Sequence, residues 1–324
     1  MKFIKILSIA LFVGSSSLFA QDPHFTQFYS APFTVNPAYT GVFEGSFRMM
    51  SNYRQQWNSL ASPYTTALVA LDAKIGNKKD VGQNPFNVGM QLMTDKSMKG
   101  AFMSNYASVV TSYHVPLDVD GYESLGAGLT FSYGQRKLDF SSLTFDSQFT
   151  SGGYDQTLPS GETALQDMKP FVSIGAGVLY QYRDADFGNY FDVGFSAYHV
   201  NQPKQTFLAD DQQYLPIRFS GQISYQHYIS ENGIINLKGL YQNQGKIEYF
   251  LGGATYAKVL NSNKDMIGLG AYYRTGDAIS PIVFFEFSDI QVGFSYDILN
   301  SNLKNAPKPL RSMEFSLQWR LGDR

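Results

Sequence analysis

The sequence predicts an all-β protein, namely a transmembrane antiparallel β-barrel of the outer-membrane type with about fourteen strands. Three observations lead to this fold class. Apolar and polar residues alternate with a period of two through most of the chain, which is the pattern of strands with two unlike faces. Many alternating runs are about ten residues long, the length that a tilted strand needs to cross a bilayer. Charged residues make up only 16% of the chain, whereas soluble domains carry about a quarter.

The composition excludes several other classes of protein. The 324 residues include 25 Lys and Arg, 27 Asp and Glu, and no Cys. The near-neutral balance offers no basic stripe for nucleic acid, and a mean hydropathy of −0.21 argues against a bundle of transmembrane helices. The abundance of aromatic residues argues against disorder. Without Cys the chain has no disulfides, Cys-based zinc sites, iron–sulfur centres or thiol nucleophile.

The first twenty residues have the pattern of a secretory signal peptide. Lys2 and Lys5 precede an apolar stretch over 6–13 that is too short to span a bilayer, and Ala20 suits a cleavage site. A structural helix is the alternative. We therefore expect residues 1–20 to be a signal peptide and the mature chain to be exported across a bacterial inner membrane.

Residues 21–42 are expected to form an extended segment that plugs or lines the periplasmic mouth of the barrel. Asp22-Pro23 and Asn36-Pro37 restrict the backbone to extended or turn conformations. The segment is too aromatic and too poor in charge to extend freely into water; its aromatic residues are Phe25, Phe28, Tyr29, Phe33 and Tyr39. The alternative is an ordered tail whose only role is to fill space.

Residues 43–324 are expected to form the barrel. The clearest alternating runs are 217–229, 312–321, 290–298 and 125–133. Weaker runs lie near 44–54, 63–73, 85–94, 102–115, 170–183, 189–200, 233–243, 246–258, 265–274 and 279–287. No long amphipathic helix and no solenoid repeat interrupts them.

A membrane barrel and a secreted β-sandwich both give alternating strands, and the two are separated by the chemistry of the faces. Tyrosines gather near the ends of runs, where the aromatic girdles of a barrel belong. Six charged residues also lie within runs on the polar face, and in a barrel this face lines the lumen. These expected lumen charges are Arg48, Asp192, Arg218, Lys238, Glu286 and Glu314. Three basic and three acidic residues suit pairing across a filled lumen better than an ion-selective pore.

Connection lengths predict the topology. One set of connections is long and polar (135–169, 201–214 and 299–310), and the alternate set contains tight turns (184–188, 230–233 and 288–289). Long outer loops and short periplasmic turns are typical of outer-membrane barrels, with both mature ends periplasmic. The long inner connection 74–84 and the tight outer turn 243–245 depart from this pattern.

The longest outer loop, 135–169, is the candidate partner-binding rim. Its aromatic residues, which sit beside acidic ones, are Phe140, Phe145, Phe149 and Tyr154. Loop aromatics that the sheet does not fix are typical anchors for a protein partner. The alternative is that they form a small core of the loop itself or close over the lumen.

Three ordered motifs near the start of the mature chain carry a family resemblance. They are Gln21-Asp22-Pro23-His24-Phe25-Thr26-Gln27-Phe28-Tyr29, then Asn36-Pro37-Ala38-Tyr39-Thr40-Gly41, then Asn52-Tyr53-Arg54-Gln55-Gln56-Trp57 followed by Pro63-Tyr64-Thr65-Thr66. This combination resembles the PorP/SprF family of outer-membrane proteins from the type IX secretion and gliding systems of Bacteroidota. The resemblance implies a non-enzymatic barrel that receives the type B C-terminal signal of certain secreted adhesins. Such a barrel would hold the adhesins at the cell surface or link them to the secretion and motility machinery.

Arg54 and Trp57 lie at the outer end of the first predicted strand and are added to the candidate partner-binding residues. In the alternative, Trp57 is an interfacial anchor and Arg54 forms an ion pair in the lumen.

No catalytic, cofactor-binding or metal site is predicted. By the expected topology the barrel histidines, His114, His199 and His227, lie at different rims and cannot converge on a metal or a triad unless long loops fold back. The sequence Asp118-Val119-Asp120-Gly121 lacks the Glu of a calcium loop at position twelve, where Leu129 stands. The pairs Gly126/Gly128, Gly175/Gly177 and Gly268/Gly270 are interpreted as small lumen or strand-crossing residues rather than phosphate loops.

Two other functions remain as alternatives. A passive pore or hydrophobic-substrate transporter would need an open lumen. An outer-membrane hydrolase would need a His beside a Ser and an acid, a set that the sequence does not assemble.

Overall fold

The fold is given by a computed structural model that describes residues 22–58, 62–75, 86–161, 168–184, 188–206, 213–261, 265–301 and 310–322. The expected signal peptide, residues 1–20, lies outside the described residues. So do parts of the predicted connections 74–84, 135–169, 184–188, 201–214 and 299–310.

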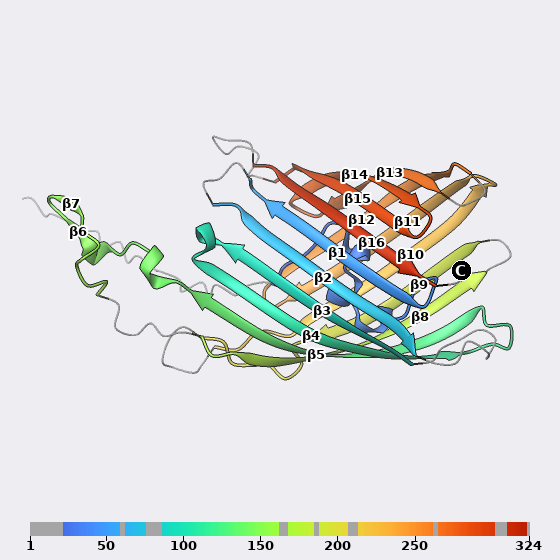
Figure 1. The fold of residues 1–324 in the computed structure, drawn as a ribbon, viewed down its shortest axis with the longest axis horizontal. Coiled ribbons are helices and arrows are strands. Elements are labelled where there is room, and N and C mark those ends of the chain that lie inside the picture. The colour runs from blue at the N-terminus through green and yellow to red at the C-terminus, as the bar shows by residue number, and fades with distance from the viewer. Residues whose placement is uncertain are drawn as a thin grey trace, which may run out of the picture.

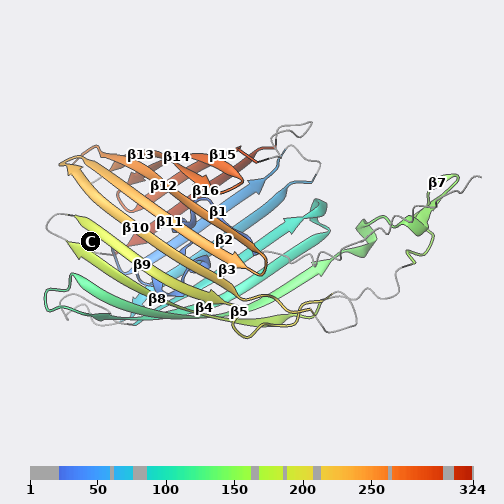
Figure 2. The ribbon, with the colours of Figure 1, turned by 180° about the vertical axis from the view of Figure 1, so that it is seen from behind.

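Fourteen antiparallel strands form a closed barrel, which confirms the predicted fold class (Figure 1 and Figure 2). The barrel strands are β1 (Phe47–Gln56), β2 (Tyr64–Ile75), β3 (Phe86–Ser97), β4 (Phe102–Pro116), β5 (Glu123–Leu138), β8 (Phe171–Asp184), β9 (Asn189–Tyr198), β10 (Arg218–Ser230), β11 (Gly233–Gln244), β12 (Ile247–Val259), β13 (Met266–Arg274), β14 (Ala278–Phe287), β15 (Ile290–Leu299) and β16 (Ser312–Leu321). Neighbours in sequence are neighbours in the sheet, and β1 pairs with β16 from Phe47↔Leu321 to Gln55↔Met313 to close it. Closure leaves the sheet without an edge, as a membrane-spanning sheet requires.

The two faces of the barrel wall differ as the alternation predicts. In β16, Phe315 is 47% exposed, whereas its neighbours Glu314 and Ser316 are 1% and 6% exposed. Leu92 and Val109 are likewise exposed on the outside of β3 and β4. An apolar outer face and a polar inner face are the arrangement of a membrane barrel, because hydrocarbon covers the outside. Among the described residues, no helix is both long and apolar enough to cross a bilayer.

The barrel has two unlike ends. At the arm end, β5 stops at Leu138 and the arm, residues 139–161, projects well beyond the wall (Figure 1 and Figure 2). The arm carries a small two-stranded sheet of β6 (Phe149–Thr150) and β7 (Gly153–Tyr154). At the opposite, terminal end, β1 begins and β16 finishes.

The N-terminal segment lies inside the barrel, where it appears as the blue coil enclosed by the strands in Figure 1. We call residues 22–43 the plug. The plug was expected to be extended, and the structure instead folds it into three single-turn 3-10 helices, η1 (Phe28–Ser30), η2 (Pro32–Thr34) and η3 (Pro37–Tyr39). Prolines open η2 and η3, a position that suits them because a nitrogen there needs no hydrogen-bond partner. The side chain of Asn36 caps η3 by accepting a hydrogen bond from Ala38 N.

Candidate functional site: the plugged lumen and the projecting arm

A buried ion cluster holds the start of the plug. Arg54 on β1 is 1% exposed. Its Nη2 lies 2.7 Å from Asp297 Oδ2, and its Nη1 lies 3.0 Å from Glu314 Oε2. Arg274 also approaches Asp297, with Nη2 3.5 Å from Oδ2. Because these charges are buried, they are stable only while each keeps its partner.

The backbone of the plug completes this cluster. Thr26 N donates to Glu314 Oε2 at 2.7 Å, and Gln27 N donates to Glu314 Oε1 at 2.9 Å. The Thr26 hydroxyl accepts from both Arg54 Nη1 and Arg274 Nη2. A single carboxylate on the last strand therefore fixes two residues at the start of the described chain.

A second contact, which we call the Asp22 latch, holds the first described residue. His199 Nε2 lies 2.6 Å and Arg218 Nη1 lies 3.1 Å from Asp22 Oδ2, with Arg136 Nη2 3.6 Å from Oδ1. Burial alone would raise the pKa of the Asp22 carboxyl, but the charges of His199, Arg218 and Arg136 hold that pKa well below its usual range. These charges therefore favour the carboxylate form of Asp22.

The latch corrects one interpretation of the sequence. A Ser, a His and an acid were not expected to converge, yet Ser173 Oγ lies 2.7 Å from His199 Nδ1, and His199 contacts Asp22. The plug itself carries Asp22 to the histidine, an arrangement that strand topology does not reveal. All three side chains are buried, the adjoining cavity measures about 40 Å³, and Arg218 already pairs with Asp22. The trio has no room for a substrate and works as a latch.

The middle of the plug packs against glycines in the wall. Asn36 Nδ2 donates to Val178 O at 2.9 Å and to Phe195 O at 3.3 Å. A Cβ at Gly177 would lie 2.1 Å from Asn36 Oδ1, and one at Gly128 would lie 2.4 Å from Ala38 N. These glycines belong to the Gly-x-Gly pairs of the sequence and provide the space into which the plug fits.

Each of the six expected lumen charges contacts a different partner. Arg48 pairs with Asp72 at 2.8 Å, Asp192 accepts from Tyr39 at 2.5 Å, and Arg320 pairs with Glu286. Lys238 Nζ lies 4.1 Å from the centre of the Tyr29 ring. Within the described ranges no ion pair joins two of the six. Sequence reasoning missed five partners, namely Asp22, Asp72, Arg136, Arg274 and Asp297. Asp72, Arg274 and Asp297 stand on the polar face of predicted runs and could have been found by parity. Asp22 belongs to the plug, and Arg136 lies on β5 where the loop 135–169 was predicted to begin, so parity could not indicate either of them.

Of the four candidate rim residues on the arm, two are exposed and two are half-buried. Phe149 and Tyr154 on the arm are 57% and 42% exposed, with ring centres 5.4 Å apart. Phe140 and Phe145 are half-buried. The arm has its own hydrogen bonds, such as Gln148 Nε2 donating to Leu158 O at 3.0 Å.

The two candidates from the end of β1 are placed apart. Trp57 lies at the arm end, with its ring centre 5.2 Å from that of Tyr64. Arg54 is buried in the ion cluster and offers no exposed surface to a partner.

The Asp22 latch leads to the first prediction. Asp22→Asn leaves Arg218 and Arg136 without a buried counter-charge, and we expect the plug to loosen at a cost of about 1.5–3 kcal/mol. Ser30 is fully buried and its hydroxyl has no hydrogen-bond partner, so Ser30→Cys is a neutral reporter in this Cys-free chain. Maleimide should label Cys at position 30 slowly alone and faster with Asp22→Asn. Equal labelling rates would show that Asp22 does not hold the plug.

Comparison with known proteins identifies a family and a fold. A model of the family described as "Type IX secretion system membrane protein PorP/SprF" matches residues 17–319. No curated protein matches the chain. Among solved structures, the deltaS2S3 mutant of the monoaromatic hydrocarbon channel TodX shares 10% identity, with 89% of this chain and 93% of that chain covered and a TM-score of 0.50.

A FadL homologue from Pseudomonas aeruginosa gives a similar result. It shares 10% identity, with 87% of this chain and 91% of that chain covered and a TM-score of 0.50. At this identity the two structures show a common barrel fold and nothing about what is bound.

In the described part of the chain no three His, Asp or Glu side chains gather as a metal site would require.

Proposed function

The chain belongs to the PorP/SprF family of type IX secretion system membrane proteins, and from this premise we propose that it is a closed outer-membrane barrel that holds a secreted adhesin at the cell surface. The occupant would be the type B C-terminal domain of the adhesin, and other components of the secretion or gliding machinery would be further partners. The barrel fold and the family together make the protein an outer-membrane β-barrel.

The plugged lumen is the observation that carries this proposal. The plug crosses the interior between β1 and β16 on one side and β8 and β9 on the other, and it is bonded to both walls. Phe25, Phe33 and Ala38 of the plug are buried to 3% exposure or less. A barrel whose interior is filled with its own chain is suited to binding on its outside surfaces rather than to conduction.

The arm supplies a surface of the right chemistry for a protein partner. Phe149 and Tyr154 form an exposed aromatic pair held in place by the β6–β7 pairing. Aromatic side chains of this kind are the usual anchors of protein interfaces. The arm also stands clear of the barrel, so a folded domain can approach it without meeting the wall (Figure 2).

The arm leads to the second prediction. Phe149→Ser combined with Tyr154→Ser should leave the barrel assembled and lower the amount of adhesin on the cell surface, because a few exposed aromatic residues carry most of the binding energy in a typical protein interface. Surface adhesin is measured by antibody labelling of intact cells. Val119→Ser is the matched control, since Val119 is a fully exposed apolar residue in the turn at the opposite end. Undiminished adhesin in the double variant would exclude the arm as the binding surface.

Conduction tests the alternative function of a passive pore or hydrophobic-substrate transporter. The purified barrel should give no stable single-channel conductance in a planar bilayer, because the plug is bonded to opposite walls. The Asp22→Asn variant should give brief openings as its plug loosens. Large, steady conductance of the unmodified protein would refute the closed-barrel proposal.

A further inference from the structure

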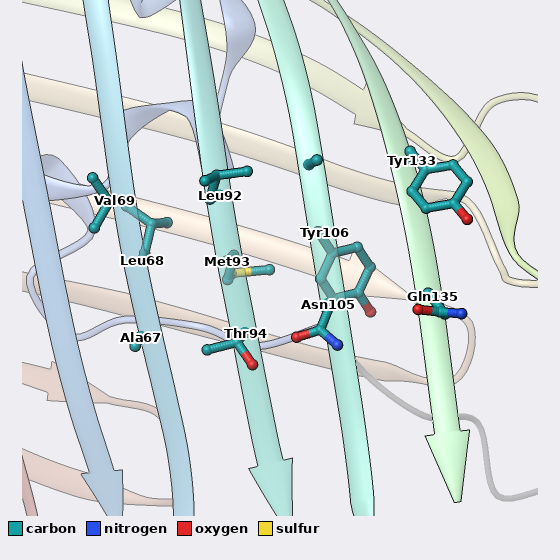
Figure 3. A pocket seen from close by; sticks show the side chains of 11 residues that line it. Ala67, Leu68, Val69, Leu92, Met93, Thr94, Asn105, Tyr106, Tyr133 and Gln135 are labelled. Atoms are coloured by element: carbon teal, nitrogen blue, oxygen red, sulfur yellow. The ribbon is translucent and has the colours of Figure 1, made fainter.

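A groove on the outside of the barrel lies across β2, β3, β4 and β5 at the arm end, and Figure 3 shows it face on. Its volume is about 420 Å³. Ala67 and Ala107 form the floor, because their side chains are too small to fill the outer face. Val69, Leu92 and Tyr133 rise around them and are 47%, 61% and 51% exposed. The groove is therefore a recess among larger apolar side chains of the outer face.

A row of polar side chains borders the groove on the side of the arm end. Thr94 pairs in register with Asn105, and Asn105 pairs with Gln135. The three side chains lie level on adjacent strands in Figure 3. The Asn105 and Gln135 amides make no hydrogen bond to any described residue. An amide facing a membrane needs a partner, because leaving its donors unbonded in an apolar medium costs free energy.

The next row toward the middle of the wall is apolar. Leu92 pairs with Ala107, and Ala107 pairs with Tyr133, two residues along each strand from the polar row. Beyond it, Val109 and Phe131 pair across β4 and β5 and are 60% and 50% exposed. This ridge ends the groove about 13 Å from Asn105, at about 3.3 Å per residue.

The polar row stands where the apolar belt meets the polar layer of a membrane. Asn105 lies near the start of β4, which begins at Phe102, and Gln135 lies near the end of β5 at Leu138. A ligand that matches the groove has a hydrogen-bonding group at this level and a hydrocarbon tail directed toward the middle of the bilayer. Membrane lipids have this form, since an ester or amide carbonyl stands at the head of each acyl chain.

We propose that the groove binds one acyl chain of a membrane lipid, with the Asn105 and Gln135 amides donating to the carbonyl at the head of that chain. The tail lies over Ala67 and Ala107 and ends at the Val109–Phe131 ridge. The site is separate from the arm and the plug, so it does not depend on which partner the arm binds.

Lipid retention by the full mature protein tests the proposal. The purified barrel is equilibrated in detergent micelles with diacyl phosphatidylethanolamine or with its dialkyl ether analogue, which has the same tails and no carbonyl. Native mass spectrometry then counts the bound lipid. We expect one diacyl lipid to remain at detergent concentrations that strip the ether lipid, and Asn105→Leu with Gln135→Leu should remove this difference.

Filling the groove with a larger side chain provides a second test. Ala107→Phe should abolish the retained lipid, whereas Ala254→Phe should not, because Ala254 is an exposed alanine on β12, outside the groove. Heat-modifiability on gels confirms that each variant is folded. Should Ala107→Phe fail to fold, the paired Leu variant still decides the question. Equal retention of ester and ether lipids by the unmodified protein, or equal loss in the two Phe variants, would overturn the proposal.

Discussion

Replacing Arg54 by Met is expected to destabilise the folded barrel by about 3–5 kcal/mol, because it leaves buried carboxylates without their counter-charge. Arg54 is 1% exposed and is the ion-pair partner of both Asp297 and Glu314. Met has a similar length and keeps the packing, so the effect reports on the charge. The measurement is the midpoint of guanidinium unfolding in detergent, followed by tryptophan fluorescence.

Two further variants separate charge from packing. Arg54→Met combined with Glu314→Gln should recover part of the lost stability, because the second change neutralises one unpaired carboxylate. Arg320→Met is the control for a less deeply buried pair, since the Arg320 side chain is 18% exposed where it meets Glu286, against 1% for Arg54, and a pair that water reaches contributes less. If Arg54→Met and Arg320→Met cost the same, the buried cluster is not a major source of stability.

Replacing Phe315 by Arg is expected to prevent most of the protein from reaching the outer membrane. Phe315 faces outward on β16 and pairs with Tyr53 and Phe294, so Arg at this position stands in hydrocarbon at a cost of about 2–4 kcal/mol. The measurement is the yield of heat-modifiable protein in the outer-membrane fraction.

The control for this substitution keeps the position apolar. Phe315→Leu should give a normal yield, because it conserves the contact with lipid and removes only the ring that lies 4.9 Å from Phe294. A normal yield of folded Phe315→Arg would show that this side of β16 does not face the bilayer.

The barrel could be predicted from the sequence because its signals are local. A period of two and a length of about ten residues are read within one strand, and the exposed Phe315 beside the buried Glu314 shows that the faces follow parity. The family resemblance was likewise carried by short motifs in the first part of the mature chain, and the match over residues 17–319 confirms it.

The contacts of the plug could not be predicted, because they join residues far apart in the chain. Thr26 and Glu314 are 288 residues apart, and Asp22 and His199 are 177 apart. The sequence around one residue of such a pair does not indicate which distant residue is its partner. The fold of the plug depends on the closed wall around it, and so the convergence of Ser173, His199 and Asp22 was missed. The glycines at 128 and 177 were visible in the sequence, but only the structure shows what occupies their space.

The bond between the plug and Glu314 has a consequence for the order of folding. Glu314 stands on the last strand to be made, and the amides of Thr26 and Gln27 cannot bind it until that strand is in register with β1. Long-range contacts of this kind form late, since the entropy of closing the intervening chain opposes them. We therefore expect the beginning of the protein to stay accessible to proteases until β16 has been assembled. We expect a chain truncated before β16 to be cut near its N-terminus faster than the complete barrel, because it lacks the carboxylate that holds Thr26 and Gln27.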